Sequence, residues 1–265
     1  MDEKQRKENF SMKRHFRLAA LLLAVLLLLP GAVAFAAPAI HEIGYPDNYP
    51  TTADEDGADA YAGSLNHPQS QYFAIVDFYN MVSGGTLHIL EKFETYQQTT
   101  EYSCGPACAR MVLHRYGVDD YDELELGGMM GCSEFNGTSV ENLAKLFADL
   151  GWNTEFNAST EPKFAEMEEA ERFLLEKLDA GVPVMVDWVD WRGHWQIVIG
   201  LDTCGTDNTN DDVLILADPY DVTDHYQDGY YIFPFGRFFD MWREGPCAGK
   251  AEPYVQAYVA AWPKA

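Results

Sequence analysis

Residues 97–113 read Gln97-Gln98-Thr99-Thr100-Glu101-Tyr102-Ser103-Cys104-Gly105-Pro106-Ala107-Cys108-Ala109-Arg110-Met111-Val112-Leu113. The pattern predicts a short polar loop that leads into a helix, with Cys104 at the junction. Ser103 is a residue type that caps helices, and Pro106 falls in the first turn, where its missing N–H costs nothing. An apolar face follows, and Gly117 is typical of a helix C-terminus.

A cysteine at a helix N-terminus lies at the positive end of the helix dipole, which favours its nucleophilic thiolate form. Nucleophilic catalysis also requires a base for the thiol and donors for a developing oxyanion. Gln98 lies shortly upstream, where its side-chain amide can join the backbone N–H of Cys104 as a second donor. The sequence therefore indicates a candidate nucleophile, Cys104, and a candidate oxyanion-hole residue, Gln98.

Two further candidates lie next to predicted strands far downstream. His194 stands at the head of the apolar run 195–199, and Asp218 directly follows the apolar run 213–217. A carboxylate at the end of a neighbouring strand can hold an imidazole in its useful tautomer. We therefore expect His194 to act as the base and Asp218 as the acid that orients it.

The order of these motifs resembles family thirty-nine of the cysteine peptidases, which is related to the double-glycine peptidases that trim bacteriocin leaders. The resemblance covers roughly residues 91–245 and rests on Gln98, Cys104-Gly105-Pro106-Ala107, Gly193-His194 and Asp218-Pro219. It implies a papain-like α+β fold, in which a helical half with the nucleophile helix packs on an antiparallel sheet. It also implies a thiol peptidase with Cys104, His194, Asp218 and Gln98 as catalytic residues.

Two other functions remain open. One is a cell-wall peptide amidase or endopeptidase, although such enzymes usually carry Asp-Cys-Ser where this chain has Ser103-Cys104-Gly105. The other is a non-catalytic binding protein on the same fold. A thiol-directed covalent probe separates an enzyme from a binding protein.

The composition limits the partners. The 265 residues carry a formal net charge of −24. Binding to nucleic acid requires clustered Lys and Arg, so a peptide or protein substrate is the expected partner. His and Cys do not fall at zinc-ligand spacings, and we expect no metal and no cofactor. A calcium site in the oxygen-rich loop 202–212 is the alternative to a solvated hairpin loop.

The amino terminus predicts export. Basic residues at 13–17 precede the apolar run 18–29, and Pro30-Gly31 break this run before small residues at 34–36. This is the composition of a secretory signal peptide, and an uncleaved membrane anchor is the competing interpretation. We expect a secreted or cell-surface protein that meets the membrane only transiently, through its signal peptide.

The chain divides into a signal peptide at 1–37, a partly flexible arm at 38–90 and a peptidase domain at 91–265. The aperiodic segment 38–66 indicates a loosely attached stretch of the arm. A short helix is expected at 71–82 and a strand at 86–90. In the domain we expect helices near 104–117, 121–131, 138–150 and 166–180, then strands near 182–188, 194–201, 213–217 and 230–234.

Three tryptophans close to His194 in the sequence, Trp188, Trp191 and Trp195, are candidate substrate-binding residues. The five cysteines fit one reactive thiol plus at most two bridges, and Cys108 is expected in the core or across the cleft. The pair Gly84-Gly85 is of the kind that the resembled peptidases cut, which raises the hypothesis of cleavage in cis. A simple turn before a strand is the alternative.

Overall fold

The computed structural model describes residues 36–47, 49, 56–61, 63–245 and 252–264. Residues from Pro38 onward form one compact unit. The predicted signal peptide lies almost entirely outside the described residues. Cys247 also lies outside them. None of the helices in the described part of the chain has the length and apolar character that a bilayer crossing demands.

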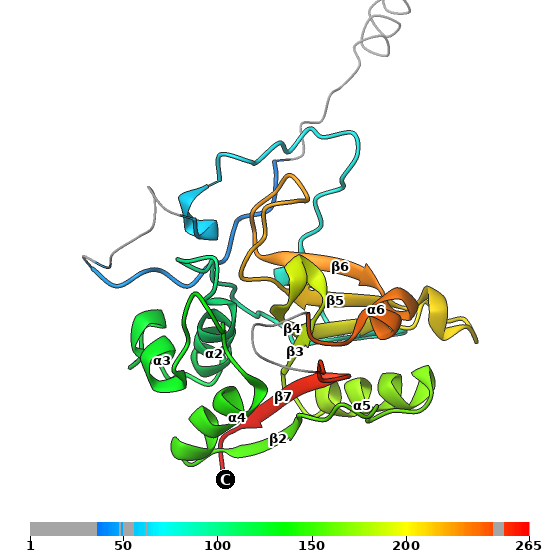
Figure 1. Cartoon of the computed structure of the whole chain (residues 1–265). Helices are drawn as coiled ribbons and strands as arrows, with labels where there is room; N and C mark the ends of the chain where they lie inside the picture. Colours follow the sequence, from blue (N-terminus) through cyan, green and yellow to red (C-terminus); the bar gives the residue numbers. More distant parts are fainter. Residues whose placement is uncertain (1–35, 48, 50–55, 62, 246–251, 265) are drawn as a thin grey trace, which may run out of the picture. The chain divides into compact units, whose positions relative to one another are not determined.

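An antiparallel sheet forms the centre of this unit (Figure 1). Its order among the described residues is β2-β7-β3-β4-β5-β6, with β1 paired to one end of β4. The strands are β1 (Leu87–Ile89), β2 (Asn153–Asn157), β3 (Val184–Trp188), β4 (His194–Asp202), β5 (Val213–Ala217), β6 (Tyr230–Pro234) and β7 (Ala257–Trp262).

The middle of the sheet is the best-predicted part of the fold. The apolar runs of β3, β4 and β5 are buried along nearly their whole length, as expected for strands covered on both faces. The sequence predicted β1 and β6 as well as these three strands, and the structure confirms all five. It did not predict β2 and β7, and β7 lies between β2 and β3 although it comes last in the chain.

The predicted helices of the domain are also confirmed, and α6 is an addition. The helices are α2 (Cys104–Arg115), α3 (Glu123–Met130), α4 (Val140–Asp149), α5 (Met167–Asp179) and α6 (Phe235–Met241). Short 3-10 turns are η1 (Ala58–Ala60), η2 (Phe78–Asn80), η3 (Asp190–Arg192) and η4 (Thr209–Asp211). The expected helix at 71–82 is wrong, because only the single turn η2 forms there.

Local hydrogen bonds set the starts of the helices. Asp122 and Glu125 form a reciprocal capping box on α3, and the Ser139 side chain accepts the N–H of Asn142 at the start of α4. Ser103 precedes α2 as expected, but its hydroxyl makes no capping bond. It bonds to the Thr100 hydroxyl at 2.7 Å instead, and this contact ties the loop to the helix start.

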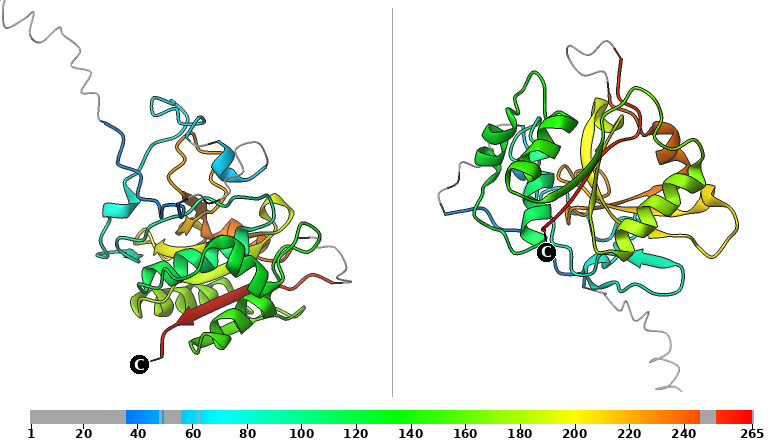
Figure 2. Two further views of the ribbon diagram at one scale, coloured as in Figure 1. Left: turned by 90° about the vertical axis from the view of Figure 1, so that its left-hand side faces the viewer. Right: turned by 90° about the horizontal axis from the view of Figure 1, so that it is seen from below.

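The helices α2, α3 and α4 form one cluster beside the sheet, and α5 lies against another part of it (Figures 1 and 2). Within the cluster α2 packs on β4, while α4 packs on β2 and β7. This is the α+β arrangement that the resemblance implied. The contact between α2 and β4 matters most, because Cys104 begins one element and His194 begins the other.

The arm is more firmly attached than expected. Ile43 donates its N–H to the Thr95 carbonyl at 2.8 Å, and Asp59 donates to the Gln98 carbonyl at 3.2 Å. Ala58 is fully buried. The expectation of a loosely attached arm is therefore wrong for these described residues. Backbone hydrogen bonds to a loop require no periodic sequence, so the pattern of residues 38–66 did not indicate them.

Candidate active site

The structure brings Cys104, His194 and Asp218 together. His194 is the first residue of β4, and Asp218 directly follows β5. Because these two strands are antiparallel neighbours, both residues lie at the same end of the strand pair. The His194 Nε2 atom lies 2.7 Å from Asp218 Oδ1. Cys104 and His194 line the same cavity, and the thiol contributes to the raised pKa of the imidazole. Because Nε2 bonds to Asp218, Nδ1 is the ring nitrogen that remains for the thiol.

The electrostatics of this group favour a charged imidazole. Burial opposes the charged form of His194, since its side chain is almost fully shielded from water. The Asp218 carboxylate and its hydrogen bond outweigh that effect, so the pKa of His194 lies well above its ordinary value. An imidazolium beside Cys104 is the partner that a thiolate requires.

Helix α2 is fixed in place by two tight contacts. Cys108, one turn after Cys104, is fully buried and donates from Sγ to the Trp195 carbonyl at 3.3 Å. Burial, with smaller contributions from nearby acidic groups, raises the pKa of Cys108 well above its ordinary value, so this thiol is a packing residue. A Cβ on Gly105 would lie 2.6 Å from the Thr138 side chain, so the glycine allows close packing.

Cys104 opens onto a cavity of about 140 Å³, which we call the Cys104 cavity. The residues that line it are Gln98, Glu101, Cys104, Trp191, Gly193, His194 and Tyr220. Gln98 donates from Nε2 to the Thr100 carbonyl at 2.6 Å, and its Oε1 is buried without a hydrogen-bond partner in the described structure. An amide nitrogen carries two N–H bonds, so one donor of Gln98 remains beyond the Thr100 contact.

The three tryptophans occupy different environments. Trp191 is 52% exposed, lines the Cys104 cavity and contacts Tyr220 edge-on at 5.6 Å. Trp188 and Trp195 are buried, so the structure does not bring them to the cavity. Trp188 packs on Phe233 and Phe238, and the Trp195 indole donates to the Thr138 carbonyl. Trp188 and Trp195 lie close to His194 in the sequence, but both faces of their strands are covered. Their side chains therefore pack in the interior instead of lining the cavity.

Sequence reasoning missed Gln196. This fully buried side chain donates from Nε2 to Asp218 Oδ2 at 2.7 Å and accepts the Trp188 indole N–H at 2.7 Å. It stands two residues after His194, and residues at that spacing share one face of a strand. A polar residue at i+2 from a catalytic histidine was the available signal.

Glu123 is a second buried polar residue near the site that the sequence did not indicate. Its buried carboxylate accepts the Tyr96 hydroxyl at 2.8 Å and the Thr99 N–H at 3.1 Å. Burial raises its pKa, although hydrogen bonds from Ser103, Thr99 and Tyr96 oppose the shift. Glu123 thus links helix α3 to the loop that carries Gln98.

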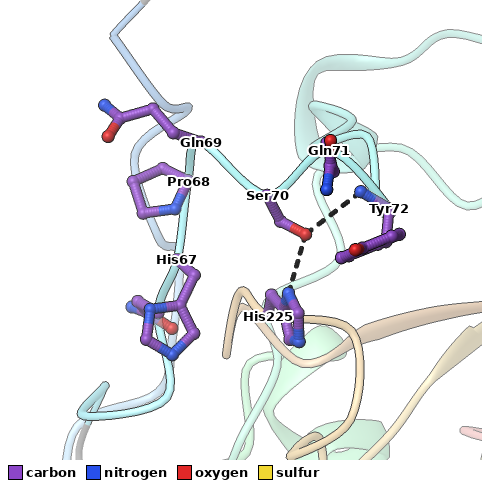
Figure 3. A pocket seen from close by; sticks show the side chains of 8 residues that line it. His67, Pro68, Gln69, Ser70, Gln71, Tyr72 and His225 are labelled. Atoms are coloured by element: carbon purple, nitrogen blue, oxygen red, sulfur yellow. Dashed lines mark hydrogen bonds between the residues drawn. The ribbon is translucent and has the colours of Figure 1, made fainter.

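A second hollow, of about 590 Å³, lies outside the Cys104 cavity (Figure 3). It is lined by residues 66–72 of the arm and by His225, whose Nδ1 lies 2.8 Å from Ser70 Oγ. Its eight lining residues include no carboxylate to orient that histidine. The described residues also contain no group of three or more His, Cys, Asp or Glu side chains that could hold a metal ion.

Comparison with known proteins identifies the family of the chain. The sequence profile described as Peptidase_C39 like family matches residues 90–246, which is more than half of the chain. The chain belongs to this family. The match confirms the resemblance to family thirty-nine of the cysteine peptidases. Among curated proteins, none matches the chain.

Two solved structures are similar to this C39-like chain. The peptidase domain of Streptococcus ComA, a bi-functional ABC transporter involved in a quorum-sensing pathway, is 18% identical with a TM-score of 0.44. That match covers 65% of this chain and 99% of the ComA domain. A double glycine motif protease from an AMS/PCAT transporter, in complex with the leader peptide, is 16% identical with a TM-score of 0.42. That match covers 64% of this chain and 91% of the protease.

Proposed function

We propose that this protein is an exported cysteine peptidase that hydrolyses peptide bonds at Cys104. The observation that carries the proposal is the arrangement of three groups: the Cys104 thiol and the His194 imidazole line one cavity, and the Asp218 carboxylate lies 2.7 Å from that imidazole. Membership of the C39-like family supports the same activity. Export rests on the predicted signal peptide at 1–37.

Each group has a defined role in the reaction. His194 takes the proton of Cys104, and the thiolate sulfur attacks the carbonyl carbon of the scissile peptide bond. The backbone N–H of Cys104 and the free N–H of Gln98 stabilise the oxyanion. His194 then gives its proton to the leaving amine as the C–N bond breaks. A water molecule, deprotonated by His194, cleaves the thioester and releases a carboxylic acid.

Asp218 and Gln196 keep this reaction geometry. Asp218 accepts from Nε2 of His194, which leaves Nδ1 to exchange the proton with Cys104. Gln196 and the N–H of Tyr220 bond to the same carboxylate and fix its plane. The acid orients the base and is not itself protonated during turnover.

A covalent probe combined with a substrate screen tests the proposal. Cys204 is exposed, and Cys247 lies outside the described residues, so a Cys204→Ser/Cys247→Ser background removes both as competing thiols. In this background we expect a peptidyl electrophile to label Cys104 stoichiometrically at neutral pH, as located by mass spectrometry. Cys108 is fully buried, and burial raises the pKa of Cys132 to about 11, so both should react slowly.

The substrate screen has two arms, a fluorogenic peptide library and a set of cell-wall peptides. Turnover that is abolished in Cys104→Ala supports a peptidase, and the preferred arm decides between a general and a cell-wall enzyme. Absence of labelling at Cys104, together with absence of turnover, would favour the non-catalytic binding protein. Localisation is tested separately, by finding the protein and its mature amino terminus in the culture medium or at the cell surface.

A further inference from the structure

The loop that carries Gln98 has no secondary structure of its own, so its position depends on its neighbours. We call residues 95–101 the Gln98 loop. On one side it contacts the segment that carries Asp218. The Gln98 N–H donates to the Pro219 carbonyl at 2.8 Å, and the Gln97 side chain donates to the Asp218 carbonyl at 3.1 Å. These contacts link the predicted oxyanion hole to the predicted acid.

The arm holds the other side of the Gln98 loop. The Tyr45 hydroxyl donates to the Gln97 carbonyl at 2.8 Å, and the Asp59 N–H donates to the Gln98 carbonyl at 3.2 Å. Asp56 Oδ1 accepts the N–H of Glu101 at 3.3 Å. Three backbone groups of the loop are therefore bonded by residues that lie more than 30 positions earlier in the chain.

The same arm is also bonded to the segment that follows Asp218. The Tyr220 hydroxyl donates to the Asp56 carbonyl at 3.1 Å, and Gln227 donates from Nε2 to the Ala58 carbonyl at 2.9 Å. Further along, the N–H of His67 donates to the His225 carbonyl, and Ser70 contacts the His225 ring (Figure 3). The arm thus connects both polar walls of the Cys104 cavity.

We propose that the arm is a positioning element of the active site, and that Tyr45 and Asp56 act through the Gln98 loop to set the oxyanion hole. The arm lies outside the family match, which begins at residue 90. The inference rests on the proposed peptidase function. A small displacement of a donor reduces transition-state stabilisation, because electrostatic catalysis depends on prior orientation.

The test uses the full chain and single-group substitutions. Tyr45→Phe removes the bond to Gln97 but keeps the ring that contacts Tyr96 at 5.1 Å. Asp56→Ala removes the acceptor for the Glu101 N–H. Tyr116→Phe is the matched control, because its hydroxyl also donates to a carbonyl, that of Gly181 at 3.1 Å, and it lies at the other end of α2.

Two reactions at Cys104 separate positioning from general damage. Peptide hydrolysis requires the oxyanion hole, whereas alkylation by iodoacetamide requires only the reactive thiol. We expect Tyr45→Phe and Asp56→Ala each to lower kcat about 3- to 10-fold with KM nearly unchanged, and the double variant to lower it more. The rate of Cys104 alkylation should stay within about twofold of wild type in all of them.

The outcomes are distinct. A fall in kcat with unchanged alkylation, and wild-type kcat in Tyr116→Phe, supports the positioning role. Equal losses in turnover and alkylation would show that the arm only maintains the fold. Wild-type kcat in the double variant would overturn the inference while leaving the peptidase function intact. If the wild-type protein hydrolyses no peptide at all, the proposed function fails first and the inference falls with it.

Discussion

Gln196 and His194 hold the two oxygen atoms of one carboxylate. Gln196 Nε2 lies 2.7 Å from Asp218 Oδ2, and His194 Nε2 lies 2.7 Å from Oδ1. All three side chains are buried, so the carboxylate receives little compensation from water. We therefore predict that Gln196 is a positioning residue that fixes the rotation of Asp218 and, through it, the plane of the imidazole.

Substitution of Gln196 tests this relationship. We expect Gln196→Leu to lower kcat about tenfold with little change in KM, because Asp218 loses one of its orienting bonds. The Trp188 indole also loses its acceptor, so the free energy of unfolding should fall by about 2–3 kcal/mol. Gln256→Leu is the control, since Gln256 is another buried glutamine, bonded to Phe164. It should lower stability similarly and leave kcat unchanged.

Asp218 is expected to control the pH dependence of activity. If an ionised thiolate–imidazolium pair is the active form, activity disappears when His194 loses its proton. Asp218 helps to hold the pKa of His194 well above the ordinary 6.5, so the alkaline limb of kcat/KM should lie above that pH. Asp218→Asn should shift this limb down by about one unit or more and lower kcat. An unshifted limb would assign the orienting role to another acid.

Acidic residues in and near the Cys104 cavity predict a preference for cationic peptides. Glu101 lines the cavity, and the Asp56 carboxylate accepts the backbone N–H of Glu101. Asp190 lies close enough to His194 for the two charges to interact. We expect a peptide with Arg beside the scissile bond to exceed its citrulline analogue about 3- to 10-fold in kcat/KM at low salt. Glu101→Gln should reduce this ratio, whereas Asp207→Asn, in the loop between β4 and β5, should not.

Buried carboxyl groups should make the protein less stable at alkaline pH. Burial raises the pKa of Asp228 to about 8, from an ordinary value of 3.8. Between about pH 4 and 8 the folded protein therefore keeps protons that the unfolded chain releases, and stability falls as the pH rises. Thermal unfolding should occur at a higher temperature at pH 5 than at pH 8.5.

Asp228→Asn isolates one of these groups. The amide oxygen can still accept the Tyr230 N–H, which Asp228 Oδ1 accepts in the structure at 3.1 Å. Stability at pH 8.5 should rise by on the order of 2 kcal/mol, because one pKa unit corresponds to about 1.4 kcal/mol. At pH 4 the effect should be small. Equal effects at both pH values would exclude proton release as the cause.

Cleavage in cis after Gly85 is not expected. Gly84 and Leu87 exchange backbone hydrogen bonds of 2.9 and 3.2 Å, which makes the two glycines a tight turn into β1. Strand β1 pairs with β4 near Asp202, and His194 lies at the opposite end of β4, about 26 Å away at 3.3 Å per residue. Mass spectrometry should find the same amino terminus in wild type and Cys104→Ala. A start at Thr86 in the wild type alone would restore the hypothesis.

The sequence predicted those parts of the molecule that local chemistry determines. The cysteine at the start of α2, the capping residue Ser139 and the apolar runs of β3–β5 all follow from short patterns, and the structure confirms these elements. Strand order next to His194 and Asp218 then brings the base and the acid together. Their catalytic roles stay predictions until the kinetics above are measured.

The missed features depend on partners that are distant in sequence. The polar strand β2 is stabilised by pairing with β7, more than 95 residues later, which no local pattern encodes. Conversely, residues 71–82 have apolar spacing that suits a helix, but the Asp77 side chain accepts the Asn80 N–H and only one turn forms. Gln196 became recognisable only when its contact with Asp218 was known.

The position of β7 also constrains when the protein can fold. This last strand lies inside the sheet, between β2 and β3, so β2 has no strand neighbour until residues 257–262 have been synthesised. Contacts of such long sequence separation are formed slowly, and the chain exposes apolar strands while they are incomplete. Synthesis of β7 therefore precedes the addition of β2 to the sheet, and a nascent chain that lacks β7 should remain more sensitive to proteases at β2 and β3.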